Sequence, residues 1–116
     1  MATIISILNL KGGVGKTTTA INLGKALSLL GKKVLTVDND PQANLTFGLG
    51  METPDQTIYT AYKDDAPLPI YNISNNYDMV PSGLELATIE SDIDRKINRY
   101  EILKAKLSEI EGNYDF

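Results

Sequence analysis

The residues best suited to chemistry form a glycine-rich run near the start of the chain, Lys11-Gly12-Gly13-Val14-Gly15-Lys16-Thr17. Polyphosphate binding requires several backbone N–H groups to converge on one anion, and glycines let the backbone curl into such a nest without side chains in the way. An ordered run of this kind rarely arises by chance, because glycine makes up only about 7% of average protein sequences. The run therefore predicts a loop that binds a nucleoside triphosphate with magnesium.

The residues that follow the glycines have the side chains this task needs. Lys16 is placed to bridge the β- and γ-phosphates, and the Thr17 hydroxyl is placed to ligate magnesium. Thr18 lies one residue further along and could donate to the α-phosphate. A helix that begins here would also direct its N-terminal dipole and free N–H groups at the same phosphates.

The loop departs from the usual phosphate-loop pattern at its start. A glycine is usual at position 10, where this chain has Leu10, and the match is instead to K-G-G-x-G-K-T with Lys11 first. Lys11 is either a solvated lysine or a second cation that reaches the nucleotide of a partner subunit. In the second role it would stabilise charge in the transition state, as an arginine finger does. The residues alone leave both alternatives open.

The segments around the loop predict a βαβ unit that would hold it in place. Residues Thr3–Leu8 are apolar and rich in β-branched side chains, which predicts a strand buried on both faces. Apolar residues then recur at helical spacing up to a capping Gly31, at Ala20, Leu23, Leu27 and Leu30. Residues Lys33–Val37 predict a second strand, closed by Asp38-Asn39-Asp40-Pro41. The two strands are expected to be parallel, with a right-handed crossover.

The middle of the chain predicts shorter elements. Short helices are expected at Ala43–Leu49 and Thr57–Tyr62. Short strands are expected at Ile70–Ile73 and Tyr77–Val80, joined by a polar turn at Ser74-Asn75-Asn76.

The last third of the chain carries a helical apolar stripe. Apolar residues step by three or four from Leu86 to Ile110, which predicts one long helix or two helices with a break near Asp92–Asp94. Gly112 would end this region. The stripe is interpreted as core rather than as a membrane or partner surface.

Composition limits the classes of function. The 116 residues suffice for one small domain, with 42% apolar and 22% charged residues and a net charge of −4. This charge gives no support to a broad basic surface for nucleic acid, although a local patch is compatible with it. With no cysteine and no histidine, disulfides, thiolate chemistry, iron–sulfur clusters and the usual zinc sites are excluded. No run approaches the ~20 apolar residues that span a bilayer, so a soluble cytoplasmic protein is expected.

Three segments together resemble a known family. They are Lys11–Thr19 (K-G-G-V-G-K-T-T-T), Ala20–Leu27 (A-I-N-L-G-K-A-L) and Val37–Thr46 (V-D-N-D-P-Q-A-N-L-T). They are similar to the ParA/MinD family of ATPases with a deviant Walker A loop, and above all to its ParA/Soj branch, which segregates plasmids and chromosomes. The resemblance covers the whole chain, but its specific motifs lie in residues 1–50.

The resemblance implies roles for individual residues. Lys11 looks like the signature lysine that crosses an ATP-sandwich dimer to the other subunit's phosphates, and Lys16 and Thr17 look like the phosphate lysine and the magnesium ligand. Asp40 looks like the aspartate that positions the attacking water, and Asp38 like a switch-region acid near the magnesium. A carboxylate just past the end of a parallel strand faces the nucleotide crevice, which suits both assignments.

The resemblance also implies a fold and its extent. The expected class is α/β, with a P-loop NTPase-like parallel sheet flanked by helices, and residues 1–116 would be the N-terminal part of a single P-loop ATPase domain. This chain would stop before the strand that carries the second acidic motif, the Walker B aspartate. A truncated piece is the simpler explanation, and a naturally short protein is the alternative. Strands left without neighbours would favour pairing with another chain, by strand exchange or through helices.

The implied function has ATP and Mg²⁺ as cofactors. The longer parent protein would hydrolyse ATP, dimerise with nucleotide, associate with non-specific DNA and respond to a ParB-like partner, while the 116-residue chain alone would be weakly active or inactive. One alternative is a nucleotide-binding or assembly module that does not turn over. Another is a MinD-like cell-division ATPase, although no membrane contact is expected from this chain.

Overall fold

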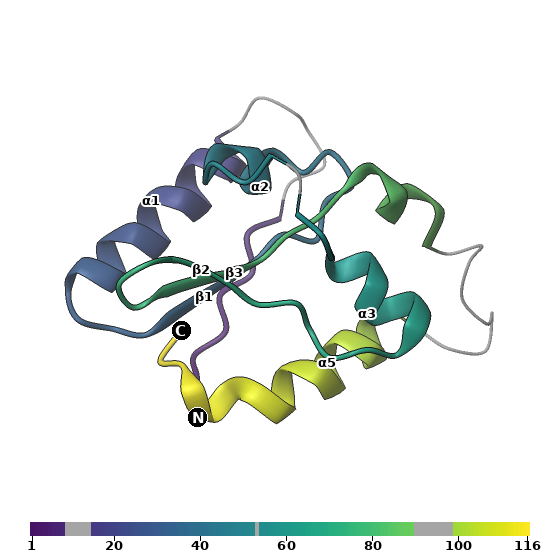
Figure 1. Ribbon diagram of the computed structural model, residues 1–116. Helices are drawn as coiled ribbons and strands as arrows, with labels where there is room; N and C mark the ends of the chain where they lie inside the picture. Colours follow the sequence, from purple (N-terminus) through teal and green to yellow (C-terminus); the bar gives the residue numbers. More distant parts are fainter. Residues whose placement is uncertain (9–14, 53, 90–98) are drawn as a thin grey trace.

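The computed structural model describes residues 1–8, 15–52, 54–89 and 99–116. The described elements include both helices and strands, and the helices lie around a small central sheet (Figure 1). In chain order they are α1 (Lys16–Leu29), β1 (Val34–Val37), α2 (Asn44–Gly48), α3 (Ile58–Asp64), β2 (Tyr71–Ser74), β3 (Tyr77–Val80), the 3₁₀ helix η1 (Leu84–Thr88), α5 (Arg99–Ile110) and the 3₁₀ helix η2 (Glu111–Asn113). Within these ranges, no helix has both the length and the apolar character that crossing a bilayer requires.

The sheet has the order β1-β3-β2 and is mixed. Strand β1 pairs with β3 in parallel, from Val34 opposite Tyr77 to Val37 opposite Val80, and β2 pairs with β3 antiparallel. Asn76 closes the β2–β3 hairpin with a φ of 62°, a left-handed conformation that asparagine tolerates well. The α/β class, these three strands and the polar turn are confirmed, and the sheet combines the expected parallel pairing, between β1 and β3, with an antiparallel β2.

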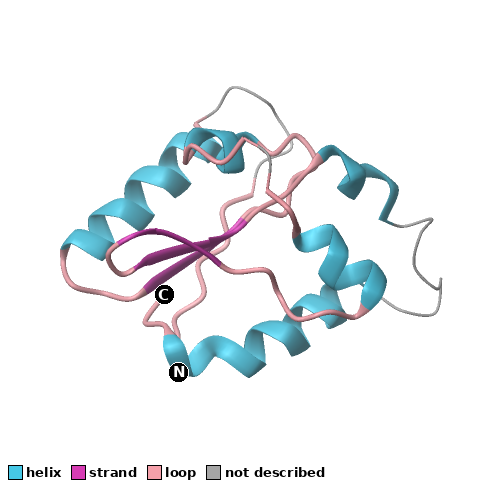
Figure 2. Ribbon diagram, in the orientation of Figure 1, coloured by secondary structure: helices cyan, strands magenta, loops and turns pink. Residues whose placement is uncertain are grey.

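The predicted strand at Thr3–Leu8 is wrong. Residues 1–8 are irregular (Figure 2), and Ile4 and Leu8 are 66% and 87% exposed rather than buried. Strand β1 pairs in parallel with β3, and the Leu35 N–H of β1 donates to Phe116 rather than to this segment, so the expected pairing of the segment with β1 does not form. Strand formation requires a neighbour as well as β-branched residues, and a local pattern cannot specify that neighbour.

Residues near the end of the chain lie between the N-terminal segment and β1. The Leu35 N–H donates to the Phe116 carbonyl at 3.1 Å, and the Phe116 N–H donates to the Lys33 carbonyl at 3.2 Å. On the other side, the Thr3 N–H donates to the Asp115 carbonyl at 2.9 Å. An apolar cavity of about 490 Å³ continues from here between the N-terminal segment, α1, β1 and α5, and it reaches Lys16.

The core lies where α3, η1 and β3 meet. Its members are buried apolar residues: Ile58, Ala61, Tyr62, Leu68, Val80, Leu86 and Ile89. Leu103 and Leu107 of α5 pack against this cluster, so the described parts of the Leu86–Ile110 stripe contribute to the core as predicted. The expected break at Asp92–Asp94 lies outside the described residues.

The two predicted short helices and the end of the first helix are confirmed. Helices α2 and α3 fall within or close to the predicted ranges Ala43–Leu49 and Thr57–Tyr62. Helix α1 ends at Leu29, and Gly31 follows with a φ of +85°, the left-handed conformation of a C-terminal glycine.

Helix α1 lies close to the sheet at Gly24. A Cβ at this position would lie 2.6 Å from the Tyr77 hydroxyl and 2.9 Å from two of its ring carbons. Tyr77 is completely buried and its hydroxyl also accepts a hydrogen bond from Thr36. The glycine therefore sets the distance between α1 and β3, which in turn places the start of α1 relative to the strand ends.

We expect Gly24→Ala to destabilise the fold by about 1–3 kcal/mol, because a buried aromatic ring would have to move. Gly48→Ala is the matched control, since the added Cβ there would meet Ile21 Cδ1, the end of a flexible side chain, at 2.7 Å, with Thr17 Cγ2 at 4.0 Å. Urea unfolding of both variants measures the difference. Equal stability of the two variants would contradict the close packing of α1 on Tyr77.

Candidate functional site

The described part of the predicted phosphate loop leads directly into a helix. Gly15 has a φ of +84°, which favours glycine, and α1 begins at the next residue. The Thr19 N–H donates to the Gly15 carbonyl at 2.8 Å, so the helical hydrogen bonds start at the loop. Lys11, Gly12, Gly13 and Val14 lie outside the described residues, and their roles stay predictions.

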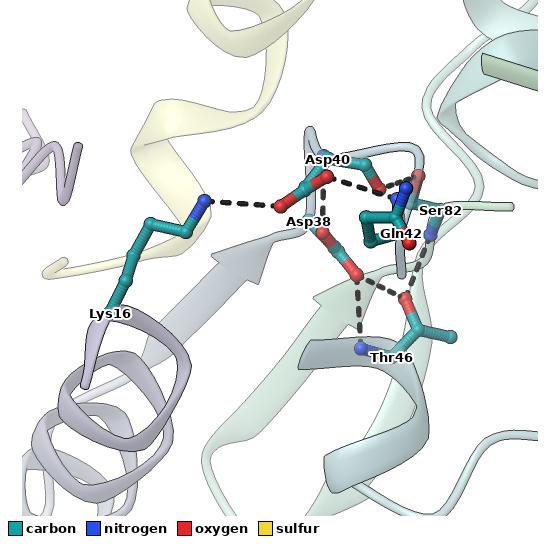
Figure 3. A network of polar contacts seen from close by, with 6 residues as sticks. All are labelled: Lys16, Asp38, Asp40, Gln42, Thr46 and Ser82. Carbon is teal, nitrogen blue, oxygen red and sulfur yellow. Dashed lines mark hydrogen bonds and ion pairs between the residues drawn. The ribbon is translucent and has the colours of Figure 1, made fainter. Parts of the chain in front are cut away.

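Lys16 and Asp40 meet at this helix start. The Lys16 ammonium lies 3.1 Å from Asp40 Oδ2, and the Gln42 N–H donates to Asp40 Oδ1 at 3.0 Å (Figure 3). The Gln42 amide and then the Lys16 ammonium hold the pKa of Asp40 below its usual value. Both side chains are about one-third exposed, at 36% and 32%. Two predicted catalytic residues, 24 positions apart in sequence, are thus brought into contact.

Asp38 lies deeper, at the end of β1. It is 3% exposed, and both of its oxygens accept hydrogen bonds. Oδ1 accepts from the Asp40 N–H at 3.2 Å, and Oδ2 accepts from the Thr46 N–H at 3.0 Å and the Thr46 hydroxyl at 2.6 Å. Burial raises the pKa of Asp38, and the bonds from Thr46 and Asp40 oppose this effect. Its metal role stays a prediction, and direct contact with magnesium would require some of these bonds to be exchanged.

Two residues at the site were not singled out by sequence reasoning. The Ser82 N–H donates to the Thr46 hydroxyl oxygen at 2.9 Å, and the Ser82 hydroxyl donates to the Asp40 carbonyl at 2.7 Å. Thr46 closes the V-D-N-D-P-Q-A-N-L-T segment, and Ser82 follows β3 in Val80-Pro81-Ser82. The only signal available was the expected convergence of strand ends, because parallel strands place their carboxyl ends at one edge of the sheet.

Thr17 is the other predicted magnesium ligand, and this role also stays a prediction. Thr17 is half-buried in the first turn of α1 and lines the same cavity as Lys16, Asp38 and Asp40, whereas Thr18 is exposed. Among the described residues, no group of three or more acidic side chains is arranged to hold a metal ion. Proteins commonly bind magnesium through one or two side chains together with substrate phosphates and water.

Acidification is expected to increase the contribution of Asp38 to stability. Its folded pKa is raised, so the folded chain binds a proton more readily than the unfolded chain. The free energy of unfolding should therefore rise as pH falls through the folded pKa toward the unfolded value of about 3.9. Urea unfolding of the wild type and Asp38→Asn at neutral and mildly acidic pH tests this: the wild type should gain relative to the variant. If acidification instead lowers the stability of the wild type relative to that of Asp38→Asn, the raised pKa is contradicted.

Comparison with known proteins identifies the family. The family model described as AAA domain matches residues 2–116. The chain belongs to the AAA domain family. Within that AAA domain family it is of the ParA/Soj type, which confirms the resemblance found in the sequence. Sporulation initiation inhibitor protein Soj of Bacillus subtilis is 45% identical over 121 residues, which cover 100% of this chain and 48% of Soj. The chain thus spans about half the length of the curated relatives it matches.

Solved structures with a similar fold match almost the whole of this chain. Cobyrinic acid a,c-diamide synthase of Mycobacterium smegmatis, solved with ADP and magnesium, superposes with a TM-score of 0.92 at 31% identity, covering 99% of this chain and 49% of that one. A plasmid partition protein of Borrelia burgdorferi gives 0.84 at 35% identity, covering 99% and 54%. The nucleotide and magnesium in the first of these agree with the cofactors predicted from the sequence.

Proposed function

We propose that this protein is a ParA-like ATPase that binds ATP with Mg²⁺ and acts in plasmid or chromosome partitioning. The observation that carries the proposal is the contact between Lys16 and Asp40 at the start of α1. A cation for the phosphates and a carboxylate for the attacking water are the two charged groups that hydrolysis needs at the γ-phosphate. The cavity that reaches both residues gives access to them.

Each residue has a defined task in this proposal. Lys16 and the N-terminal N–H groups of α1 bind the phosphate tail, and the Thr17 hydroxyl helps to hold the magnesium ion. Magnesium supplies charge neutralisation on the phosphate oxygens. Asp40 orients a water molecule for in-line attack, and its lowered pKa keeps it ionised and able to accept a hydrogen bond from that water. Lys11 would add a second cation from a partner subunit.

The partners and the location in the cell belong to the same proposal. Curated relatives are named for chromosome partitioning, including ParA of Caulobacter vibrioides, and one solved relative is a plasmid partition protein. By analogy we propose nucleotide-dependent dimerisation, association with non-specific DNA, control by a ParB-like partner and a cytoplasmic location. The described part of the apolar stripe packs into the core, which argues against a membrane-bound, MinD-like role for that stripe.

Calorimetry and phosphate release test the proposed function. Titration of ATP in the presence of Mg²⁺ should give a saturable heat that disappears with EDTA. The rate of phosphate release should rise with ATP concentration and then saturate. Binding without release would favour the alternative of a nucleotide-binding module that does not turn over. No heat with any adenine or guanine nucleotide would reject both interpretations.

Lys11→Ala is expected to leave ATP affinity within about threefold of the wild type but to remove ATP-dependent dimerisation and lower turnover by about 10²-fold or more. The reason is that its ammonium is proposed to act on the partner's nucleotide rather than on its own. Light scattering with and without ATP measures the dimer. Lys32→Ala, an exposed lysine after α1, is the control and should dimerise normally. If Lys11→Ala dimerises with ATP as the wild type does, Lys11 is a solvated lysine and does not act on the partner's nucleotide.

A further inference from the structure

The backbone of Asp40 is held by hydrogen bonds at both ends of the residue. Its N–H donates to Asp38 Oδ1 at 3.2 Å. Its carbonyl accepts from the Ser82 hydroxyl at 2.7 Å and from the Ala43 N–H at 2.9 Å. With the N–H and the carbonyl both engaged, the peptide cannot rotate freely, so the direction in which the Asp40 side chain leaves the backbone is set by Asp38 and Ser82.

Thr46 connects the two residues that hold Asp40. Its hydroxyl donates to Asp38 Oδ2 at 2.6 Å and accepts from the Ser82 N–H at 2.9 Å. Its own N–H adds a second bond to Asp38 Oδ2 at 3.0 Å. Figure 3 shows Thr46 on helix α2, with Asp38 at the end of β1 and Ser82 just beyond β3. One side chain therefore joins three elements that meet behind Asp40.

We propose that Thr46 is a positioning residue for Asp40, acting through Asp38 and Ser82. The proposal rests on the proposed function, in which Asp40 orients the attacking water. Thr46 is completely buried and bonds to the residues behind Asp40, so its effect on the reaction passes through the geometry of Asp40. Such an effect appears in kcat, whereas binding of ATP depends on Lys16 and the helix start.

The hydroxyl, rather than the volume of the side chain, carries this role. A hydroxyl can donate one hydrogen bond and accept another at once, which is how Thr46 is used here. Serine keeps both bonds, whereas valine keeps the shape and loses both, leaving the buried Ser82 N–H without its acceptor. Thr46→Ser and Thr46→Val therefore separate a positioning role from packing.

The test compares these two variants in steady-state ATP hydrolysis and in amide hydrogen exchange. Thr46→Ser should keep kcat within about threefold of the wild type. Thr46→Val should lower kcat by about 10–10²-fold with the KM for ATP changed less than about threefold, because small misplacements of a catalytic group are costly. The Asp40 and Ser82 amides of Thr46→Val should exchange at least about tenfold faster, with Met79 in β3 unchanged.

Failure of the Thr46 proposal can be distinguished from failure of the proposed function. If the wild type does not hydrolyse ATP, the proposed function fails, but the exchange of the Asp40 amide still tests the role of Thr46. A Thr46→Val protein with wild-type kcat or wild-type exchange at Asp40 would overturn the proposal. An equal loss of kcat in Thr46→Ser and Thr46→Val would also overturn it, since serine keeps the hydroxyl.

A second variant, Ser82→Ala, tests the same proposal if Thr46→Val does not fold. Ser82→Ala removes only the bond to the Asp40 carbonyl and should lower kcat by about threefold to tenfold at constant KM. Ser108→Ala is its control, because the Ser108 hydroxyl donates to a backbone carbonyl on the exposed side of α5. Identical kcat values for Ser82→Ala and Ser108→Ala would exclude the Ser82 contact, and with it the route from Thr46 to the Asp40 carbonyl.

Discussion

Replacing Asp40 with asparagine is expected to lower ATP turnover by about 10²–10³-fold, in the range measured for the loss of a group that assists proton transfer. Asparagine has nearly the same shape and its carbonyl oxygen can keep the bond from the Gln42 N–H. Asparagine lacks the negative charge that faces Lys16. It also lacks the carboxylate oxygen that would accept a proton or a strong hydrogen bond from the attacking water. The affinity for ATP should fall little, or rise, because a charge that repels the phosphates is removed.

Single-turnover hydrolysis and calorimetry measure these two effects separately. Asp64→Asn, at the exposed end of α3, is a matched control that should leave both unchanged. If Asp40→Asn hydrolyses ATP at the wild-type rate, Asp40 does not orient the water. If instead the variant loses ATP binding, the contact with Lys16 serves to build the binding site rather than to perform the reaction.

Lys16→Ala is expected to weaken ATP binding by about 10²-fold or more, with no measurable hydrolysis. A hydrogen bond between charged groups contributes roughly 1.5–3 kcal/mol, and the lysine is proposed to bridge two phosphates. The variant also leaves the Asp40 carboxylate without its cation, close to where the phosphates would bind. Both effects reduce affinity in the same direction.

Calorimetry with ATP and Mg²⁺ measures the loss of affinity. Lys25→Ala is the control on the same helix, because the Lys25 ammonium donates to Ser74 Oγ at 3.2 Å, away from the loop. The melting temperature of both variants should stay close to that of the wild type, since Lys16 is partly exposed. Wild-type affinity in Lys16→Ala would remove the basis of the proposed site.

The elements that depend on local patterns could be predicted from the sequence. Helix α1 and the strands β1 and β3 follow from apolar periodicity and β-branched runs, and the turn at Asn76 follows from a residue type that tolerates positive φ. The segment Thr3–Leu8 has an equally strong local pattern, but whether it forms a strand depends on a neighbour that is distant in sequence. Lys106 shows the same limit: it lies within the apolar stripe, yet it is buried and paired with Asp65 at 3.0 Å.

Some residues of the candidate site could be predicted from the sequence and others could not. Lys16 and Asp40 could be predicted, because each lies in a short motif with a specific chemistry. Thr46 and Ser82 are common hydroxyl residues separated by 36 positions, and neither has a pattern that distinguishes it from a surface residue. Their role is visible only when β1, α2 and the end of β3 are seen together around Asp38.

The ion pair at the start of α1 has a consequence for the order of events. A triphosphate tail and the Asp40 carboxylate compete for the same lysine ammonium, 3.1 Å from Asp40 Oδ2. A nucleotide that engages the lysine draws the positive charge of the ammonium toward the phosphates, which weakens its hold on Asp40 Oδ2 and leaves that oxygen able to accept a hydrogen bond from water. Arrival of the substrate would thus free the carboxylate that orients the attacking water, which Lys16 holds in the absence of nucleotide.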